Sequence, residues 1–157
     1  MIDEFEMKGQ SERFDPRLFA LIPHRPPMLL INRIVNVSEK QSSAIVLIDE
    51  KTPFFDTKYG VPSWIGIEYM GQTAALIAGY QLEQGLVKPY LGFLIGARSY
   101  QVKQAYFSSG QSLQVHCQEE AVVGNELASF NCKIYYDDID DWLAQASLSV
   151  LRQPLPK

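Results

Sequence analysis

One segment decides the fold of this chain: Tyr59-Gly-Val-Pro-Ser-Trp-Ile-Gly-Ile-Glu-Tyr-Met-Gly-Gln-Thr-Ala-Ala-Leu-Ile-Ala-Gly-Tyr-Gln-Leu82. Apart from Glu68 it carries no formal charge, and as a helix it would be apolar nearly all the way round. A helix of that kind has to be enclosed by protein. Burying an isolated carboxylate costs several kcal/mol unless it is paired, hydrogen-bonded or protonated. We therefore expect Glu68 to be satisfied by specific partners or used in chemistry.

The composition is that of a single globular domain. The chain has 157 residues, of which 46% are hydrophobic, and we expect a leader over 1–14 followed by one domain over 15–157. The net charge is −4 and no basic stripe is present, which excludes a typical nucleic-acid binder. Acidic residues occupy the place of a signal peptide's basic region, so we expect a cytoplasmic protein. The four glycines and several polar residues of 59–82 argue against a membrane helix.

The remaining pattern predicts a short helix and six strands. A proline after Asp15 favours a helix over 17–22, which must end by Pro23, and Gly85 is suited to end the long helix. Alternating apolar residues predict strands, the third of them bent at Gly96. The predicted strands are 28–37, 42–48, 91–106, 112–122, 126–136 and 142–150, and the long helix is 62–83.

Two cysteines give a test of register. If Gly124-Asn125 forms a two-residue hairpin turn, Cys117 and Cys132 become direct cross-strand neighbours. A disulfide is then geometrically possible. In a chain without a signal peptide we expect two small buried thiols instead.

One buried helix followed by antiparallel strands has few packing solutions, so the sheet must curl around the helix, giving an α+β fold. Such a roll leaves a sheet edge unpaired. Joining that edge to the same edge of a second copy would cover it.

Two motifs suggest a family. The N-terminal motif Leu21-Ile-Pro-His-Arg-Pro-Pro-Met-Leu-Leu-Ile-Asn-Arg33 and the central-helix motif Val61-Pro-Ser-Trp-Ile-Gly-Ile-Glu-Tyr-Met-Gly-Gln72 resemble those of the hotdog-fold β-hydroxyacyl-acyl-carrier-protein dehydratases. Together with the strand order, the resemblance covers about residues 15–152. Within the family, the chain looks most like the divergent partner dehydratases associated with aryl-polyene pathways.

The resemblance implies an active-site acid at Glu68 but no base at the usual position. Family members carry a histidine where this chain has Phe54, and a glycine whose amide holds the thioester oxygen where it has Ser63. That histidine removes the α-proton of a 3-hydroxyacyl thioester while the acid assists loss of water, and a positioned base contributes about 10²–10⁴-fold. We expect Phe54, Ser63, Trp64 and Gln72 to contact substrate. The helix amino end is a suitable cradle for the thioester oxygen, although Ser63 also suits an ordinary N-cap.

Few side chains can replace the missing histidine. His24 is the first candidate, with a structural role as the default in relatives. His116 alternates with core-facing neighbours and is expected to point outward. Asp56 is otherwise a solvated loop residue.

Three functions remain open. In the first, the chain is a dehydratase subunit that completes its site with a hotdog partner. In the second, it is a self-sufficient hydro-lyase or thioesterase that uses His24 or a water held by Glu68. In the third, it is a non-catalytic module that binds an acyl thioester or acts as a scaffold. The expected partners are an acyl carrier protein with a phosphopantetheine-linked acyl chain and a homodimer or heterodimer mate. No metal-ligand spacing, phosphate loop or dinucleotide motif is present, so we expect no cofactor. Substrate preference would depend on tunnel residues such as Trp64, Phe93 and Tyr100.

Overall fold

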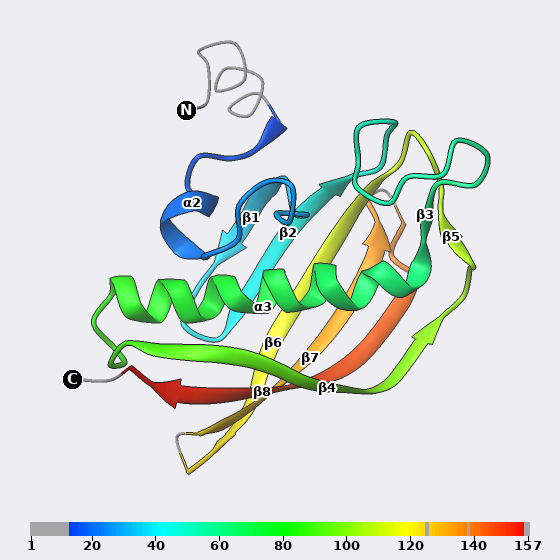
Figure 1. Cartoon of the computed structure of the whole chain (residues 1–157). Coiled ribbons are helices and arrows are strands. Elements are labelled where there is room, and N and C mark those ends of the chain that lie inside the picture. The colour runs from blue at the N-terminus through cyan, green and yellow to red at the C-terminus, as the bar shows by residue number, and fades with distance from the viewer. Residues whose placement is uncertain (1–12, 125, 138, 156–157) are drawn as a thin grey trace.

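A computed structural model describes residues 13–124, 126–137 and 139–155, and its main feature is one antiparallel sheet curled around one long helix (Figure 1). The sheet has six strands in the order β1-β2-β6-β7-β8-β4, and a separate pair is formed by β3 and β5. This confirms the predicted α+β roll. The elements are α2 (Leu18–Leu21), β1 (Arg33–Val37), β2 (Gln41–Leu47), β3 (Val61–Pro62), a 3-10 turn (Ser63–Ile65), α3 (Gly66–Glu83), β4 (Tyr90–Val102), β5 (Tyr106–Phe107), β6 (Ser112–Val123), β7 (Leu127–Tyr136) and β8 (Ala144–Pro154).

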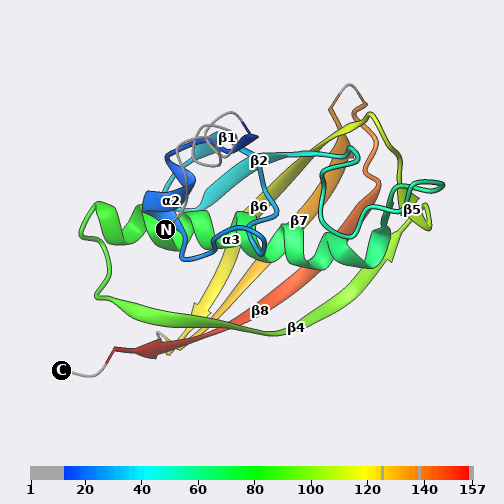
Figure 2. The same ribbon diagram turned by 45° about the horizontal axis from the view of Figure 1, so that its top comes forward.

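The long helix α3 lies across the concave side of the sheet, as the two ribbon views agree (Figures 1 and 2). Its sheet-facing side is buried, with Met70, Leu76 and Ile77 fully inaccessible. The predicted start at residue 62 is four residues early, because the first turn is 3-10 and the α-helix begins at Gly66. Gly85, at φ 71°, follows the end of the helix as predicted.

The strand predicted over 28–37 is wrong in its first half, since β1 begins only at Arg33. In the preceding segment, Leu30 donates its N–H to the Gln72 side chain at 2.8 Å and not to a strand, whereas Asn32 already bonds to β2 through the Ile45 carbonyl at 2.9 Å. Leu29 and Leu30 are both inaccessible, whereas Met28 and Val35 within the predicted strand are exposed.

The predicted pairing of Cys117 with Cys132 is confirmed, but the turn that led to it is not a two-residue one. Val123 pairs with Leu127, which leaves a longer connection, and a bulge between Glu119 and Ala121 restores the expected register. Asn125 of the predicted turn lies outside the described residues. Both thiols are buried and free, with their sulfurs 2.9 Å apart.

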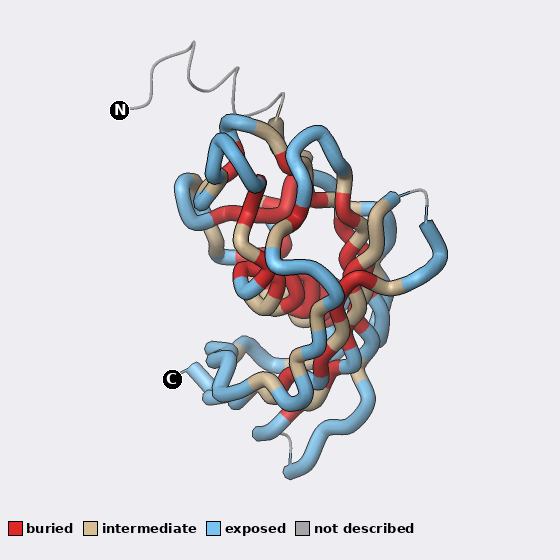
Figure 3. The backbone as a smooth tube through the Cα atoms, turned by 90° about the vertical axis from the view of Figure 1, so that its right-hand side faces the viewer, coloured by how far each residue is buried: buried red, intermediate tan, exposed pale blue. Residues whose placement is uncertain are grey.

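The two edges of the sheet differ. At one edge β1 is short, and Asp15 accepts the Ile34 N–H at 3.3 Å. At the other edge β4 spans 13 residues, pairs only with β8 among the described strands, and is exposed over most of its length (Figure 3). Its register shifts between Leu94 and Gly96, where a bend was predicted.

Of the expected leader, residues 1–12 lie outside the described residues, whereas Phe14 is buried against the domain. Across the described ranges, no helix combines the length and apolarity needed to cross a membrane.

Candidate functional site

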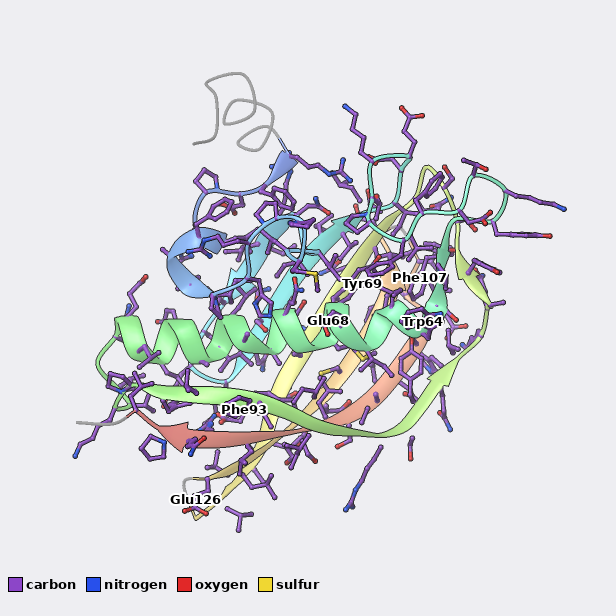
Figure 4. The ribbon with its side chains drawn as sticks, viewed as in Figure 1. Trp64, Glu68, Tyr69, Phe93, Phe107 and Glu126 are labelled. Atoms are coloured by element: carbon purple, nitrogen blue, oxygen red, sulfur yellow. The ribbon has the colours of Figure 1, made fainter. Side chains whose placement is uncertain are left out.

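Glu68 lies in the first turn of α3, and its side chain is held by Gln72 one turn further on (Figure 4). The Gln72 Nε2 donates to Glu68 Oε1 at 3.3 Å and to the Met28 carbonyl at 2.8 Å, while its Oε1 accepts the Leu30 N–H. Gln72 is fully buried, and both of its N–H donors are in use. In this arrangement Gln72 orients Glu68, and its contact with substrate stays a prediction.

His24 sits within the electrostatic reach of Glu68. Burial lowers the pKa of the His24 imidazole, while the charge of Glu68 raises it and that of Arg25 lowers it. The His24 Nδ1 is buried and has no hydrogen-bond partner among the described residues. Arg25 fixes the surrounding backbone by donating to the carbonyls of Phe19, Ile22 and His24. The charge of Glu68 thus acts on an imidazole whose Nδ1 has no partner in the described part of the chain.

The amino end of α3 offers N–H groups, although not all are free. The Ser63 N–H donates to the Ala105 carbonyl at 2.9 Å. Ser63 makes no side-chain cap and lies inside the 3-10 turn, so its interpretation as an ordinary N-cap is wrong. The Trp64 N–H follows and has no acceptor within the turn, whereas the i→i+3 pattern of the 3-10 turn uses the Ile65 N–H for the Pro62 carbonyl.

Tyr100 fixes this amino end from the sheet. Its hydroxyl donates to the Ser63 carbonyl and occupies the space that a side chain at Gly66 would need. Burial raises the pKa of Tyr100 to about 12, so it remains a donor throughout the physiological range.

Phe54, at the position where the resemblance predicts a histidine, is solvent-exposed. It is 53% accessible, has a φ of 67°, and its ring lies 6.2 Å from that of Trp64, which is 64% accessible. A positive φ is costly for a bulky residue. A strained, exposed aromatic pair thus stands beside the amino end of α3.

The other candidate bases, His116 and Asp56, form hydrogen bonds with groups other than Glu68. His116 is on the side of the sheet that faces away from α3, as predicted, and its Nδ1 lies 2.7 Å from the Ser43 hydroxyl. Burial and Lys133 lower the pKa of His116. Asp56 caps an exposed turn by accepting the N–H of Lys58 at 2.8 Å.

Sequence reasoning missed the contacts that order the site. Met28 and Leu30 take part through backbone atoms, which no side-chain pattern reveals. Tyr69 is fully buried beside Phe107, and its hydroxyl lacks a partner among the described residues (Figure 4). Burial and Tyr100 raise the pKa of Tyr69, which keeps it neutral.

Chemically, one chain provides an oriented carboxyl group, N–H donors at a helix amino end and an aromatic wall. The carboxyl group can exchange a proton with a bound hydroxyl, and the N–H groups can stabilise a developing oxyanion. Phe54 provides no proton acceptor at the position where the resemblance predicts a histidine.

Comparison with known proteins identifies the family. The ApeP-like model, described as ApeP dehydratase, matches residues 16–156. A 3-hydroxyacyl-[acyl-carrier-protein] dehydratase FabZ from Anaeromyxobacter dehalogenans is 32% identical over 81 residues, covering 48% of this chain and 52% of the relative. The FabZ of Magnetococcus marinus is 37% identical over 68 residues, covering 40% and 44%. The chain thus spans about half the length of the curated relatives it matches.

Solved structures share the fold. The dehydratase heterocomplex ApeI:P from Xenorhabdus doucetiae matches with a TM-score of 0.77 at 23% identity, covering 88% of this chain and 91% of that chain. The Escherichia coli PaaI protein of the phenylacetic acid degradation operon matches with a TM-score of 0.60 at 12% identity, covering 76% and 82%. The predicted hotdog fold and the resemblance to the dehydratase family are confirmed.

Proposed function

This chain belongs to the ApeP-like family of dehydratases, and from that premise we propose that it is one subunit of a 3-hydroxyacyl-thioester dehydratase. It contributes the acid Glu68 to a site whose base comes from another hotdog subunit. The observation that carries the proposal is the contrast between the two positions: Glu68 is oriented by Gln72, whereas Phe54 stands exposed where an imidazole is expected.

The proposed reaction divides proton transfer between the two subunits. The partner's imidazole takes the α-proton of the 3-hydroxyacyl thioester, the bond between C3 and its hydroxyl breaks, and Glu68 gives the hydroxyl the proton with which it leaves as water. The product is the trans-2-enoyl thioester. The Trp64 N–H stabilises the thioester oxygen as negative charge develops. Proton return from imidazolium to Glu68 completes the cycle.

The exposed edge of the sheet supports assembly with a partner. Leu91, Phe93 and Ile95 on β4 are 49%, 46% and 57% accessible, and a long apolar edge strand in water is an aggregation hazard. Pairing β4 with the edge strand of another hotdog subunit satisfies its backbone groups and removes the exposed edge. A comparable structure is described as a heterocomplex, which favours a heterodimer.

The substrate is proposed to arrive on an acyl carrier protein, as the names of the FabZ relatives suggest. The flexible pantetheine arm would carry the thioester to the amino end of α3, where Phe54 and Trp64 form an exposed aromatic wall.

The proposal is tested by assaying hydration of a 2-enoyl thioester with the chain alone, its hotdog partner alone and the two mixed. The mixture is expected to exceed the sum of the separate rates. Glu68→Gln in this chain should remove the excess. The matched control is Glu83→Gln, at the exposed carboxyl end of the same helix. A mixed rate that is indifferent to Glu68→Gln contradicts the proposal and favours a non-catalytic binding or scaffolding role.

A second candidate is a self-sufficient enzyme, either a hydro-lyase or a thioesterase, in which His24 is the base. It is favoured by one observation: the His24 Nδ1 has no partner in the described part of the chain and feels the charge of Glu68. The purified chain alone would then turn over a thioester, and His24→Asn would abolish turnover while His116→Asn would not. Inactivity of the chain alone rules this candidate out.

A further inference from the structure

A pocket of about 360 Å³ lies beside the carboxyl end of α3. The end of this helix, the start of β4 and the end of β8 lie together in both ribbon views (Figures 1 and 2). Four of the lining residues are apolar, namely Leu86, Val87, Pro89 and Pro154. Glu68 is in the first turn of α3, about 20 Å away along the helix axis. The pocket is therefore separate from the site proposed for dehydration.

The connection that forms this pocket is held at both ends. Gly85, at φ 71°, ends the helix, and the Leu86 N–H returns to the Gln81 carbonyl at 2.9 Å, as in a Schellman motif. At the other end, the Leu155 N–H donates to the Pro89 carbonyl at 3.3 Å, which joins the connection to the end of β8. These bonds fix the pocket within one chain.

A buried ion pair contributes to the lining of the pocket. The Arg152 Nη2 donates to the Glu119 Oε1 at 2.8 Å, and the two side chains are 9% and 8% accessible. Gln81 donates from its Nε2 to the other oxygen of Glu119 at 3.3 Å. Arg152 lines the pocket, and its Nε and Nη1 form no hydrogen bond with the described residues. The Glu126 carboxylate is at the tip of the β6–β7 hairpin and does not line the pocket (Figure 4). Arg152 therefore has donors left for a ligand.

The Tyr90 hydroxyl also lacks a partner. It is buried and bonds to no described residue, while the Arg152 guanidinium lies 5.1 Å from the centre of its ring. Burial raises the pKa of Tyr90, with smaller effects from Arg152, which lowers it, and Glu119, which raises it. Tyr90 therefore stays protonated and can donate. Because buried hydroxyl groups in native proteins are nearly always hydrogen-bonded, an unpaired donor at a pocket points to a ligand with an acceptor.

The charges around the pocket favour a ligand with a single negative charge. Two of the described lining residues, Lys88 and Arg152, are cationic, and Glu119 neutralises one of these charges. Glu83, at the end of α3, pairs with Arg17 at 3.9 Å. A carboxylate matches the charge that remains, whereas a phosphate monoester carries about −1.5 to −2 at pH 7. A guanidinium group also suits the two oxygens of a carboxylate, which it can bind side by side.

We propose that this pocket binds a small organic monocarboxylate. The carboxylate accepts hydrogen bonds from Arg152 and from the Tyr90 hydroxyl, with the Lys88 ammonium nearby, and the apolar body of the ligand packs against Leu86 and Pro89. The volume is at the lower end of the range of about 300–1,000 Å³ for small-molecule sites, so the ligand is a short-chain or medium-chain acid. An acyl thioester group has no such charge, so this ligand differs from the substrate proposed for Glu68.

The test is the binding of octanoate to the purified full chain, measured by isothermal titration calorimetry and by amide NMR. Saturable binding is expected, with the largest shifts at 86–90 and 152–154. Tyr90→Phe should weaken this binding about ten-fold or more, because a hydrogen bond to a charged acceptor is lost. The variant removes a hydroxyl that has no partner among the described residues, so its thermal midpoint should be unchanged. The matched control is Tyr135→Phe, at a partly exposed position of β7, which should bind octanoate like the wild type.

Two further comparisons test the role of charge. Lys88→Gln should weaken octanoate binding about three-fold, as for an exposed ion pair, and octan-1-ol should bind at least about ten-fold more weakly than octanoate. Octan-1-ol binding as tight as that of octanoate, tighter binding of octyl phosphate, or an unchanged affinity in Tyr90→Phe overturns the proposal. The absence of saturable octanoate binding, or shifts centred on 63–72, overturns it as well. None of these measurements depends on turnover, so they are independent of the dehydratase tests.

Discussion

Replacing Gln72 with leucine should destabilise the domain without creating a cavity, because the two side chains are similar in volume. The change leaves the buried Leu30 N–H without an acceptor, which lowers the free energy of unfolding by about 1–3 kcal/mol. It also removes a donor from the Met28 carbonyl. Since Met28 is exposed, its carbonyl can find water and adds about 1 kcal/mol. The expected loss in the free energy of unfolding is therefore about 2–4 kcal/mol.

This loss corresponds to a fall in thermal midpoint of about 5–15 °C for a domain of this size. The assay is urea unfolding at fixed protein concentration, with Gln84→Leu as control because Gln84 lies exposed just beyond α3. Hydrogen exchange of the Leu30 amide should accelerate in the Gln72 variant alone. A loss below about 0.5 kcal/mol, with Leu30 exchange unchanged, would refute the assignment of Gln72 as the residue that joins Glu68 to the 28–30 segment.

Two further predictions concern His24 and the packing of α3. The pKa of His24 should lie below its usual value, so the free energy of unfolding should fall as the pH drops below about 6.5. Glu68→Gln should lower the His24 pKa further, whereas Glu83→Gln should not. NMR titration of the chain's two imidazoles measures the His24 pKa in each variant. Gly79→Ala should lower the free energy of unfolding by at least about 2 kcal/mol, because the new Cβ would lie against a backbone carbonyl of α2. At Gly71 the nearest contact of a new Cβ would be 3.7 Å, so Gly71→Ala should raise the free energy of unfolding by up to about 1 kcal/mol through helix propensity. Urea unfolding measures both changes. Equal effects at the two glycines would contradict the close packing of α2 on α3.

Sequence patterns predicted those parts of the fold that depend on side-chain periodicity. Apolar residues around the whole of 62–83 predicted the enclosed helix, and the assumed Gly124-Asn125 turn placed Cys117 opposite Cys132. The same reasoning indicated that a sheet edge is left unpaired, without indicating which one. The enclosed helix follows from burial, and the order of apolar residues along the chain indicates burial directly.

The errors concern backbone hydrogen bonds that side-chain type does not encode. Residues 28–32 look like a strand, yet Leu30 bonds to a glutamine 42 positions away in sequence. Ser63 looks like a helix cap, yet its N–H bonds to Ala105. Because of the bulge between Glu119 and Ala121, the predicted register is correct although the hairpin connection is longer than predicted. At the site, the roles of Glu68 and of Phe54 stay predictions, and sequence did not indicate that Gln72 orients Glu68.

The central claim is that Glu68 supplies the acid of a site whose base belongs to another subunit. The most direct test removes the partner's own acidic residue while keeping its histidine, then measures turnover after mixing with this chain. Wild-type chain should restore dehydration, and the Glu68→Gln chain should leave at most about 1% of that rate, as expected when a positioned acid is lost. Equal restoration by the wild-type and Glu68→Gln chains would contradict the claim.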